Sequence, residues 1–587
     1  MNKNLRKVTH EADLCIVGGG MSGLCAAVSA ARHGMKVVLM QDRPVLGGNA
    51  SSEIRMWISG AHGKNNRETG ILEEIMMENY YRNPNRTYPV WDSVLFDLAK
   101  REKNITLIMN CSCNDAEMEG NSIKKIIGWQ TTTQMWHIVE ARYFADCSGD
   151  SILAPLTNAE YRVGREARSE FNESIGPEVA DDKTMGLTCQ IQAVETNSKT
   201  TFIPPEQSRK FTPATLYPRY PNIKSIYENY WYLELGGEAD SIHDTEELRD
   251  ELVRVAYGMW DFIKNDHEIE ADNWELSFMG FLPGKRESRR YVGDYIMTQN
   301  DVEAEGRFDD IIAYGGWTMD DHNPKGIDGN ERPTIHWPAP SPYGIPYRCI
   351  YSKNISNLFF AGRNISVTHA ALSSTRVMAT CSILGQALGT AASIAKKYDT
   401  SPRGVYENHI NELKQTLMED DCYIPFNKME MSEISRKATY KSSGENVEML
   451  INGYQRPIGD CDNMWKGKCG DYIEINFDKT TDVKEINFTF DSDLNRETVC
   501  EDKDLCDKVT MCNRSLSLKP ICIPKTLVKS LKIEAMIDGE YKELDGIKDN
   551  YQRAVRVPVN EKADGLRITL LDTNGNETVG IHSVNIF

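Results

Sequence analysis

Apolar residues follow a strand–helix–strand rhythm near the start of the chain. Within residues 13–48, one short apolar run precedes the first glycine turn and another covers 36–40, and the segment between them is rich in alanine and other small side chains. Short apolar runs predict strands buried on both faces, and the segment between them has the length and composition of a helix that covers a sheet. The pattern therefore predicts a βαβ unit with two parallel strands.

The turn between the first strand and the helix has the spacing Gly18-x-Gly20-x-x-Gly23. Glycines at this spacing let the chain turn tightly, let a pyrophosphate approach bare backbone and let the helix pack closely on the strand, while the N-terminal amides of the helix face the phosphates. The turn lies between a strand and a helix, and the second strand follows at the expected distance. A dinucleotide cofactor is therefore the first functional prediction.

Further along the chain, the periodicity predicts that this α/β fold is interrupted by an insertion and followed by an all-β region. The expected elements are helices near 69–79 and 90–101, a strand at 105–109, an antiparallel meander over 121–144, a strand at 357–362 that ends in a glycine turn, a long helix over 373–395, and short alternating strands at 472–477, 483–490, 530–536 and 565–571.

The fold class is predicted to be α/β, with a Rossmann-like nucleotide-binding domain, an inserted substrate or cap domain, and a C-terminal β-sandwich. The predicted boundaries are residues 1–160 and 345–400 for the discontinuous first domain, 161–344 for the insert, 401–435 for a linker with helices, and 436–587 for the sandwich.

Residues 14–31 form an uncharged run behind a basic N-terminus and superficially resemble a signal peptide or membrane span. Gly18, Gly19, Gly20, Ser22 and Gly23 interrupt the run, and its removal would destroy the glycine turn. We therefore expect neither a targeting segment nor a membrane span.

The net charge and the cysteines argue against nucleic-acid binding and against a metal site. The net charge of −19 argues against nucleic acid as a partner, because no basic stripe offsets the repulsion. The 15 cysteines are odd in number, and several fall in predicted core segments, which indicates a reducing, cytoplasmic location. Cys500, Cys506, Cys512 and Cys522 lack the close CxxC pairs of a zinc or iron–sulfur site, so no metal is predicted.

The early glycine turn, the strand at 357–362 and the Gly385-Gln386-Ala387 helix together resemble the FAD-dependent oxidoreductases related to fumarate reductase and succinate dehydrogenase flavoprotein subunits. Residues 47–55, 286–290 and 362–366 are similar to a largely uncharacterised bacterial branch that is often encoded beside carbohydrate-degrading genes. The resemblance covers residues 10–400 and implies that FAD is the cofactor.

The resemblance also implies which residues hold FAD. The helix that begins at Ser373 would point its N-terminus at the N1–C2=O edge of the flavin, where reduction places negative charge. The usual acidic residue after the second strand is replaced by Gln41, so Asp42 is expected to hold the ribose, and Arg363 stands where many relatives have an acid. The implied contacts are Gly18, Gly20, Ser22, Gly23, Gln41, Asp42, Arg43, Gly47, Gly48, Asn49, Asp146, Gly149, Asp150, Gly362, Arg363, Asn364, Gly385 and Gln386.

A flavin enzyme needs groups that orient the substrate and move a proton. His369 is the first choice for the base, because it lies just before the helix expected at the flavin, and His322 is the second, because a neighbouring carboxylate orients it. The full candidate set is His369, His322, His62, Arg376, Arg289 and Arg55, with Trp136, Trp274, Trp317 and Trp337 as candidates for stacking on a sugar and His336 as a further histidine.

These residues predict oxidation of a hydroxyl group on a small polar substrate, a carbohydrate or polyol, by hydride transfer to flavin N5. One alternative is a fumarate-reductase-like interconversion of C–C and C=C bonds beside a carboxylate. Another is an FAD-containing carbohydrate-binding protein without turnover. Residues 471–477 and 550–553 are similar to galactose-binding-like sandwich modules, although a packing role or homo-oligomer formation would account for the sandwich equally well.

Overall fold

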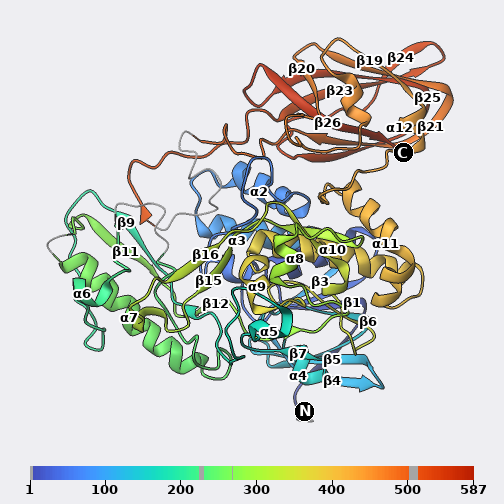
Figure 1. Cartoon of the computed structure of the whole chain (residues 1–587). Coiled ribbons are helices and arrows are strands. Elements are labelled where there is room, and N and C mark those ends of the chain that lie inside the picture. Colours follow the sequence, from blue (N-terminus) through green and yellow to red (C-terminus); the bar gives the residue numbers. More distant parts are fainter. Residues whose placement is uncertain (1–3, 224–229, 267–268, 501–512) are drawn as a thin grey trace. The chain divides into compact units, whose positions relative to one another are not determined.

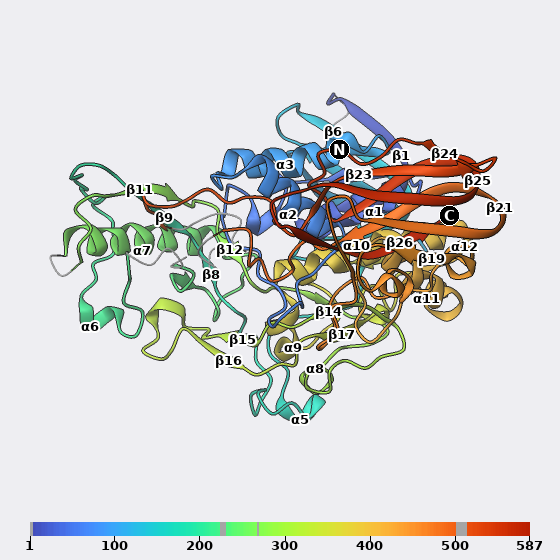
Figure 2. The same ribbon diagram turned by 90° about the horizontal axis from the view of Figure 1, so that it is seen from above.

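The computed structural model describes residues 4–223, 230–266, 269–500 and 513–587. The chain divides into two compact units. The first, which we call the α/β unit, comprises Met1–His62, Arg86–Leu413 and Lys508–Leu518, and the second, the β unit, comprises Gly63–Asn85, Lys414–Asp507 and Lys519–Phe587. Figures 1 and 2 show the elements of both units in two views.

A seven-stranded sheet forms the centre of the α/β unit, with a parallel part that continues from the predicted βαβ unit and an antiparallel meander at one edge. Residues 14–17 and 37–40 of the parallel part are buried, which explains their continuous apolar sequence. In spatial order the strands are β3 (Ile105–Ile108), β2 (Val37–Met40), β1 (Lys7–Val17), β6 (Met135–Asp146), β5 (Ser122–Gln130) and β4 (Cys111–Glu119), with β18 (Leu358–Phe360) parallel to the last residues of β6.

Helices α1 (Met21–Arg32) and α10 (Met378–Lys397) pack against each other with their backbones in close contact. A Cβ atom on Gly385 would lie 2.0 Å from the carbonyl oxygen of Ser22, and one on Gly389 would lie 2.3 Å from that of Ala26. Among the described residues α10 is the one helix long and apolar enough to cross a membrane, and 94% of its apolar window is buried inside the protein. It is therefore a core helix of this unit.

The predicted helix at 373–395 is two helices, α9 (His369–Thr375) and α10, separated at Arg376 and Val377. Val377 has an extended backbone (φ −66°, ψ 145°), which stops the first helix and starts the second. The Thr368 hydroxyl accepts a hydrogen bond from the Ala371 amide and caps α9. The N-terminus expected at Ser373 therefore lies at Met378 instead.

The inserted segment has a core of its own, in which α7 (Thr245–Asn265) lies beside β9 (Ile191–Glu195) and β11 (Trp274–Met279) in both views. Helix α3 (Tyr88–Arg101) contacts α1 and β3 beside the central sheet. The remaining strands and short helices of the insert, with the short helix that leads into it, are α4 (Leu153–Thr157), β7 (Tyr161–Arg162), α5 (Arg168–Phe171), β8 (Leu187–Thr188), α6 (Pro213–Leu216), β10 (Glu234–Leu235), β12 (Gly284–Lys285), β13 (Arg290–Tyr291), α8 (Gln299–Glu303), β14 (Ile311–Gly315), β15 (Met319–His322), β16 (Thr334–Trp337) and β17 (Tyr343–Pro346).

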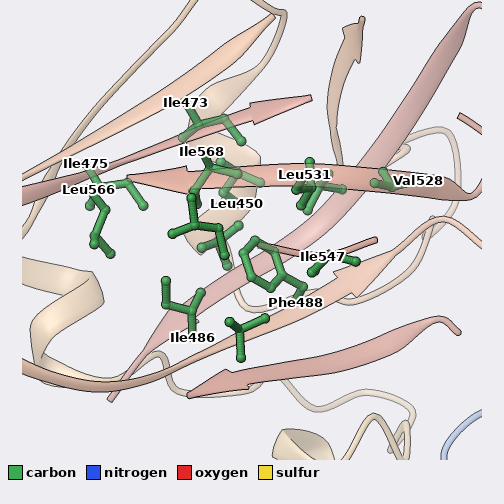
Figure 3. Close-up of a cluster of buried hydrophobic side chains, with 14 of the residues drawn as sticks. Leu450, Ile473, Ile475, Ile486, Phe488, Val528, Leu531, Ile547, Leu566 and Ile568 are labelled. Atoms are coloured by element: carbon green, nitrogen blue, oxygen red, sulfur yellow. The ribbon is translucent and has the colours of Figure 1, made fainter. Parts of the chain in front are cut away.

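The β unit contains an antiparallel β-sandwich, as predicted. The two runs expected at 472–477 and 483–490 form one long strand with two irregularities in its pairing. Figure 3 shows Ile475, Phe488, Leu566 and Ile568 in its apolar core. The elements are α11 (Pro402–Glu419), which crosses the boundary between the two units in sequence, α12 (Glu433–Lys437), β19 (Thr439–Ser442), β20 (Trp465–Lys468), β21 (Tyr472–Phe490), β23 (Val528–Ile537), β24 (Glu540–Glu543), β25 (Ala554–Thr573) and β26 (Thr578–Ile586).

The described cysteines are free thiols except for one that is disulfide-bonded. Twelve of those described are free, and nine of the twelve are buried. Cys500 takes part in a disulfide bond, while Cys506 and Cys512 lie outside the described residues. Among the described residues, no group of three or more His, Cys, Asp or Glu side chains is arranged to hold a metal ion.

One segment near the N-terminus belongs to a different unit from the one its sequence position suggested. Residues 63–85, which carry α2 (Ile71–Arg82), join the β unit instead of the nucleotide-binding domain. They are held there by an ion pair between Glu73 and Arg496, whose side chains are each 1% exposed. Burial raises the pKa of Glu73, but Arg496 lowers it by more than burial raises it, so the pKa lies below its ordinary value and the carboxylate stays charged.

Arg496→Met should lower the free energy of unfolding of the β unit by about 3–5 kcal/mol, because it leaves Glu73 buried without its cation. Hydrogen exchange of peptides from β21 and β25 across a urea titration measures this unit alone. Lys437→Met, which breaks an exposed pair with Glu433, is the control and should leave stability nearly unchanged, because solvent screens this pair. The Arg496→Met effect should shrink as the pH falls below 4.5, the ordinary pKa of Glu73, because the lowered folded pKa makes this stability available only at higher pH. An Arg496→Met protein as stable as the control would contradict the assignment.

Candidate active site

A cavity of about 660 Å³ lies within the α/β unit. Its volume falls in the range of about 300–1,000 Å³ that is usual for ligand pockets. One part of the lining, which we call the sheet wall, consists of turns at the ends of the central strands. The other part, the insert wall, comes from the inserted segment and consists of Trp231, Ile242, Thr245, Leu282, Pro283, Gly284, Lys285, Arg286, Arg289, Trp317, Asp320, His322 and His336.

The three glycines of the first turn have different roles. Gly18 has a φ of +100°, and a Cβ atom there would lie 2.4 Å from the carbonyl oxygen of Cys147. A Cβ atom on Gly23 would lie 1.8 Å from the carbonyl oxygen of Gly18, so Gly23 packs the helix on the turn and does not line the cavity. A Cβ atom on Gly20 would meet only Gly48, at 3.8 Å. Gly20 therefore leaves a bare stretch of backbone beside the cavity.

The end of the second strand departs from the usual ribose site. Gln41 is buried, and its side-chain oxygen accepts a hydrogen bond of 2.7 Å from the Gly19 amide. Asp42 and Arg43 follow it and line the cavity. Arg43 Nη1 is buried without a hydrogen bond and lies 3.6 Å from Glu53 Oε2. Asp42 and Arg43, and not Gln41, offer free polar atoms to a ribose.

The next loop completes the sheet wall at Gly47, Gly48 and Asn49. Gly47 has a φ of +101°, and its amide donates to the carbonyl oxygen of Gly19. Asn49 Nδ2 donates to the carbonyl oxygen of Lys285, at 3.0 Å. The predicted second loop thus joins the first glycine turn to the insert wall.

A cluster of charged side chains lies where the glycine turn at residue 149 meets the strand at residues 358–360. Asp150 accepts hydrogen bonds from Lys285 Nζ at 2.8 Å and Arg363 Nη2 at 2.7 Å. Burial raises the pKa of Asp150, but the two cations outweigh burial and lower it. All three residues line the cavity, together with Gly149, Gly362 and Ser22.

Four other residues predicted to contact FAD lie outside the cavity lining. Asp146 is fully buried and holds its own turn, because it accepts hydrogen bonds from the Leu153 amide and the Tyr291 hydroxyl. The carbonyl oxygen of Asn364 pairs with the Tyr291 amide. Gly385 permits the contact of α1 with α10, and Gln386 is buried in α10. The segments that carry these four residues border the cavity, and the contacts named above for the four lie in packing and turn structure.

The insert wall places a histidine between two carboxylates. His322 is 4% exposed, and its Nδ1 lies 2.9 Å from Glu234 Oε2 while its Nε2 lies 3.2 Å from Asp320 Oδ2. Arg286 lies 3.1 Å from Glu234. Burial raises the pKa of Glu234, but Arg286 and His322 outweigh burial and lower it, so this carboxylate is held in its charged form.

Arg376 occupies the junction between α9 and α10 and lines the cavity with Val377 and Met378. Its Nη2 donates to the carbonyl oxygen and to Oδ2 of Asp320, at 3.0 and 3.1 Å. Its Nε is buried without a hydrogen bond. The N-terminus of α10 therefore faces the cavity beside a guanidinium group, as the resemblance implied for this helix, although it begins five residues later than expected.

His369, the first choice for the base, lies outside the cavity lining. Its Nδ1 is 2.9 Å from Glu287 Oε2 and its Nε2 is 3.2 Å from Asp321 Oδ1. Burial lowers the pKa of His369, but Glu287 and Asp321 outweigh burial and raise it to about 10. A histidine that is already protonated at neutral pH does not accept a proton, so we no longer assign it as the base.

Two further candidates act in packing. Arg55 donates to Gln192 Oε1 at 2.8 Å, and its guanidinium lies 3.8 Å from the centre of the Phe278 ring, outside the lining. His62 is exposed and stacks on Trp317 with the ring centres 4.3 Å apart. Of the predicted tryptophans, Trp317 alone lines the cavity, while Trp274 belongs to the core of the insert.

Arg289 does line the cavity, as predicted. Its guanidinium lies 5.5 Å from the centre of the Tyr161 ring, and Nη1 is 3.4 Å from the carbonyl oxygen of Asp150. Sequence reasoning missed Trp57, Trp231 and Glu234 altogether and noted Lys285, Arg286 and His336 without assigning them roles. No local motif identifies these residues, because they meet only after the insert folds back on the sheet.

These features fit a dinucleotide. Gly20 offers bare backbone, and the free donors Arg43 Nη1, Arg363 Nε and Arg376 Nε are suited to phosphate and carbonyl oxygens. A family profile described as "FAD dependent oxidoreductase" matches residues 13–417. The chain belongs to this family. FAD is therefore its cofactor, and the matched span contains every residue of the cavity lining.

Curated relatives match a short part of the chain. The aerobic glycerol-3-phosphate dehydrogenases of Staphylococcus aureus strains USA300 and NCTC 8325 / PS 47 are each 32% identical over 94 residues, which is 16% of this chain and 16% of the relative. A match of this length does not carry the relatives' activity over to the whole chain.

Solved structures similar to this chain include carbohydrate-binding modules. The family 32 module from Streptococcus pneumoniae EndoD is 15% identical, with a TM-score of 0.20, and the match covers 27% of this chain and 99% of the module. The module from C. perfringens NanJ in complex with galactose is 14% identical, with a TM-score of 0.18 and coverage of 27% and 97%. Similarity at this level carries no argument about what the sandwich binds.

Gly20→Val should give a folded protein without bound FAD, because the side chain has space in the fold but fills the backbone cradle. The ratio of visible flavin absorbance to protein absorbance measures the bound cofactor, and circular dichroism reports the fold. Gly23→Ala is the matched comparison and should instead reduce folding, since its Cβ atom would clash with Gly18. Full flavin content in Gly20→Val would contradict this position for the cofactor.

His369→Gln should destabilise the protein most at and below pH 6.5 and least above pH 10. The folded pKa of about 10 exceeds the ordinary value of 6.5, so the stability that this charge supplies is complete below 6.5 and is lost as the pH rises through about 10. The melting temperatures of the parent and the variant across this range measure it. His243→Gln, at an exposed site, is the control. A constant difference across the range would overturn the assigned charge of His369.

Proposed function

We propose that this FAD-dependent oxidoreductase oxidises a hydroxyl group of a small polar substrate, a carbohydrate or polyol. The observation that carries the proposal is the pairing of His322 with Glu234 in the wall of the cavity. A histidine oriented by a carboxylate is the usual general base for removing a hydroxyl proton. The family membership supplies the redox chemistry, because FAD, when bound, would take up the hydride that carries both electrons of the oxidation.

In this mechanism the substrate hydroxyl takes the place of Asp320 at Nε2 of His322, where the present contact is 3.2 Å long. Glu234 stays at Nδ1 and stabilises the imidazolium that forms when His322 takes the proton. Arg286 keeps Glu234 charged during this step. Asp320 retains hydrogen bonds from Arg376 and Thr334 when the substrate displaces it from His322.

The remaining side chains of the cavity favour a ligand rich in oxygen atoms. Trp317 Nε1 and Arg376 Nε are buried donors that have no acceptor within the described part of the chain. The indoles of Trp57, Trp231 and Trp317 all line the cavity and offer apolar faces of the kind on which sugar rings stack. Arg286 and Arg376 are each paired with a carboxylate, which suits a neutral polyol better than an anion.

The name of the relatives describes the dehydrogenation of glycerol-3-phosphate, a hydroxyl oxidation of the class proposed here, but their substrate is an anion and the match covers 16% of either chain. A second candidate function is the interconversion of C–C and C=C bonds beside a carboxylate. Arg289 favours it, because this cavity-lining guanidinium has no carboxylate partner among the described residues. An acidic substrate would supply that partner.

The test is anaerobic bleaching of the bound flavin by a panel of monosaccharides, oligosaccharides, polyols and unsaturated diacids. His322→Gln should keep FAD but slow bleaching by the best substrate by about 10²–10⁴-fold, the usual contribution of a general base. Glu234→Gln should slow it in the same direction. His336→Gln is the matched control, because His336 also lines the cavity, where its Nδ1 lies 2.9 Å from the Thr318 hydroxyl and 3.6 Å from Asp320 Oδ1.

Two outcomes would change the assignment. A large loss in His336→Gln with normal rates in His322→Gln would move the base to His336. The second candidate function would be favoured if no sugar or polyol bleached the flavin, if unsaturated diacids reoxidised the reduced enzyme, and if Arg289→Gln abolished that reoxidation.

A further inference from the structure

A short segment from the C-terminal part of the sequence completes a sheet in the insert. Strand β22 (Asn513–Arg514) pairs in parallel with β9, so that Asn513 lies beside Ala193 and Arg514 beside Val194 (orange arrow beside β9 in Figure 1). The next residues fasten it further, since the Leu516 amide donates to Glu195 Oε2 at 2.9 Å. Residues 513–516 are therefore an integral part of the insert, although strands of the β-sandwich precede and follow them in sequence.

Asn513 contacts a strained residue. Its side chain is fully buried and its Nδ2 donates to the Tyr230 hydroxyl, at 3.3 Å and 283 positions away in sequence. Tyr230 is also fully buried and has a φ of +45°, in the left-handed region that a bulky residue rarely adopts. Such a conformation is unfavourable by itself and persists only where the surroundings hold it. The Asn513 contact is one of the interactions that hold it.

The strained residue directly precedes part of the active-site wall. The carbonyl oxygen of Trp231 accepts hydrogen bonds from Arg286 and Thr188, and its indole meets the His322 ring edge to face, with the ring centres 5.3 Å apart. Glu234, the partner of His322, follows three residues later on β10. The backbone direction at Tyr230 therefore sets where the indole of Trp231 lies against the proposed base.

We propose that Asn513 is a positioning residue for the oxidation. By holding Tyr230 in its left-handed conformation, it keeps Trp231 against His322 and so shapes the part of the cavity that receives the substrate. This inference rests on the proposed function only for its effect on turnover. The placement of Trp231 by Asn513 is a separate, structural statement.

The placement is tested first, in the FAD-loaded full-length protein and without any substrate. The fluorescence of Trp231 is measured as a difference. For each variant, the emission of the same protein that also carries Trp231→Phe is subtracted from the emission of the protein that retains Trp231. In Asn513→Ala this emission should become more accessible to quenching by acrylamide, because the indole is no longer held against His322. Tyr230→Phe, which removes the other partner without changing the core volume, should give the same change.

The double variant Asn513→Ala with Tyr230→Phe should show no more quenching than either single variant, because both substitutions remove the hydrogen bond between these two residues. Ser517→Ala is the control, because this exposed serine in the same segment hydrogen-bonds to Ser515 and not to Tyr230. Unchanged quenching in both Asn513→Ala and Tyr230→Phe, with circular dichroism normal, would overturn the inference. So would fully additive effects in the double variant, which would mean that the two residues act separately.

The second measurement uses the compound of the panel that bleaches the flavin fastest. Asn513→Ala and Tyr230→Phe should each raise its half-saturating concentration about two- to tenfold, the effect of losing one hydrogen bond, with FAD content unchanged and with a smaller effect on the limiting rate. A changed quenching of Trp231 without this shift would restrict Asn513 to a structural role. If no compound bleaches the flavin, the proposed function fails, and the quenching result still decides the placement of Trp231.

Discussion

Contact between backbones at glycine is the constraint on which the α/β unit depends. A Cβ atom would lie 1.8 Å from a carbonyl oxygen at Gly23 and 2.0 Å from one at Gly385. These contacts bring the first turn, α1 and α10 together, and they leave Gly20 facing the cavity. A side chain at Gly385 would separate the two helices, one at Gly23 would push α1 away from the first turn, and either would disturb the fold that forms the cradle for FAD.

Paired charges give the insert wall its chemistry. Arg286 with Glu234 and Arg376 with Asp320 are buried or half-buried pairs that surround His322. Buried pairs of this kind contribute little net stability compared with apolar packing, but they fix the positions of the groups involved. His369 also lies between two carboxylates, but it is outside the cavity lining, and Glu287 and Asp321 raise its pKa to about 10, so it stays protonated away from the substrate.

Each unit contains a chain segment whose neighbours in sequence belong to the other unit. For this reason the predicted boundaries differ from those of the two units. Residues 63–85 follow the FAD-binding βαβ unit in sequence, yet the ion pair of Glu73 with Arg496 holds them in the β unit. Residues 513–516 lie between strands of the sandwich, yet they extend the sheet of the insert through β9. Both attachments depend on partners hundreds of residues away, which local hydrophobic patterns do not record.

By itself, the sequence determined the parts of this protein whose physics is local. Glycine spacing at residues 18–23 and the apolar runs beside it were sufficient for the nucleotide-binding turn, and alternating residues after position 436 were sufficient for the sandwich. Tertiary structure alone decided which histidine faces the cavity. His322 and His369 both lie beside carboxylates, but β15 directs Asp320 and His322 to the cavity and Asp321 to His369, because successive side chains of a strand point to opposite faces.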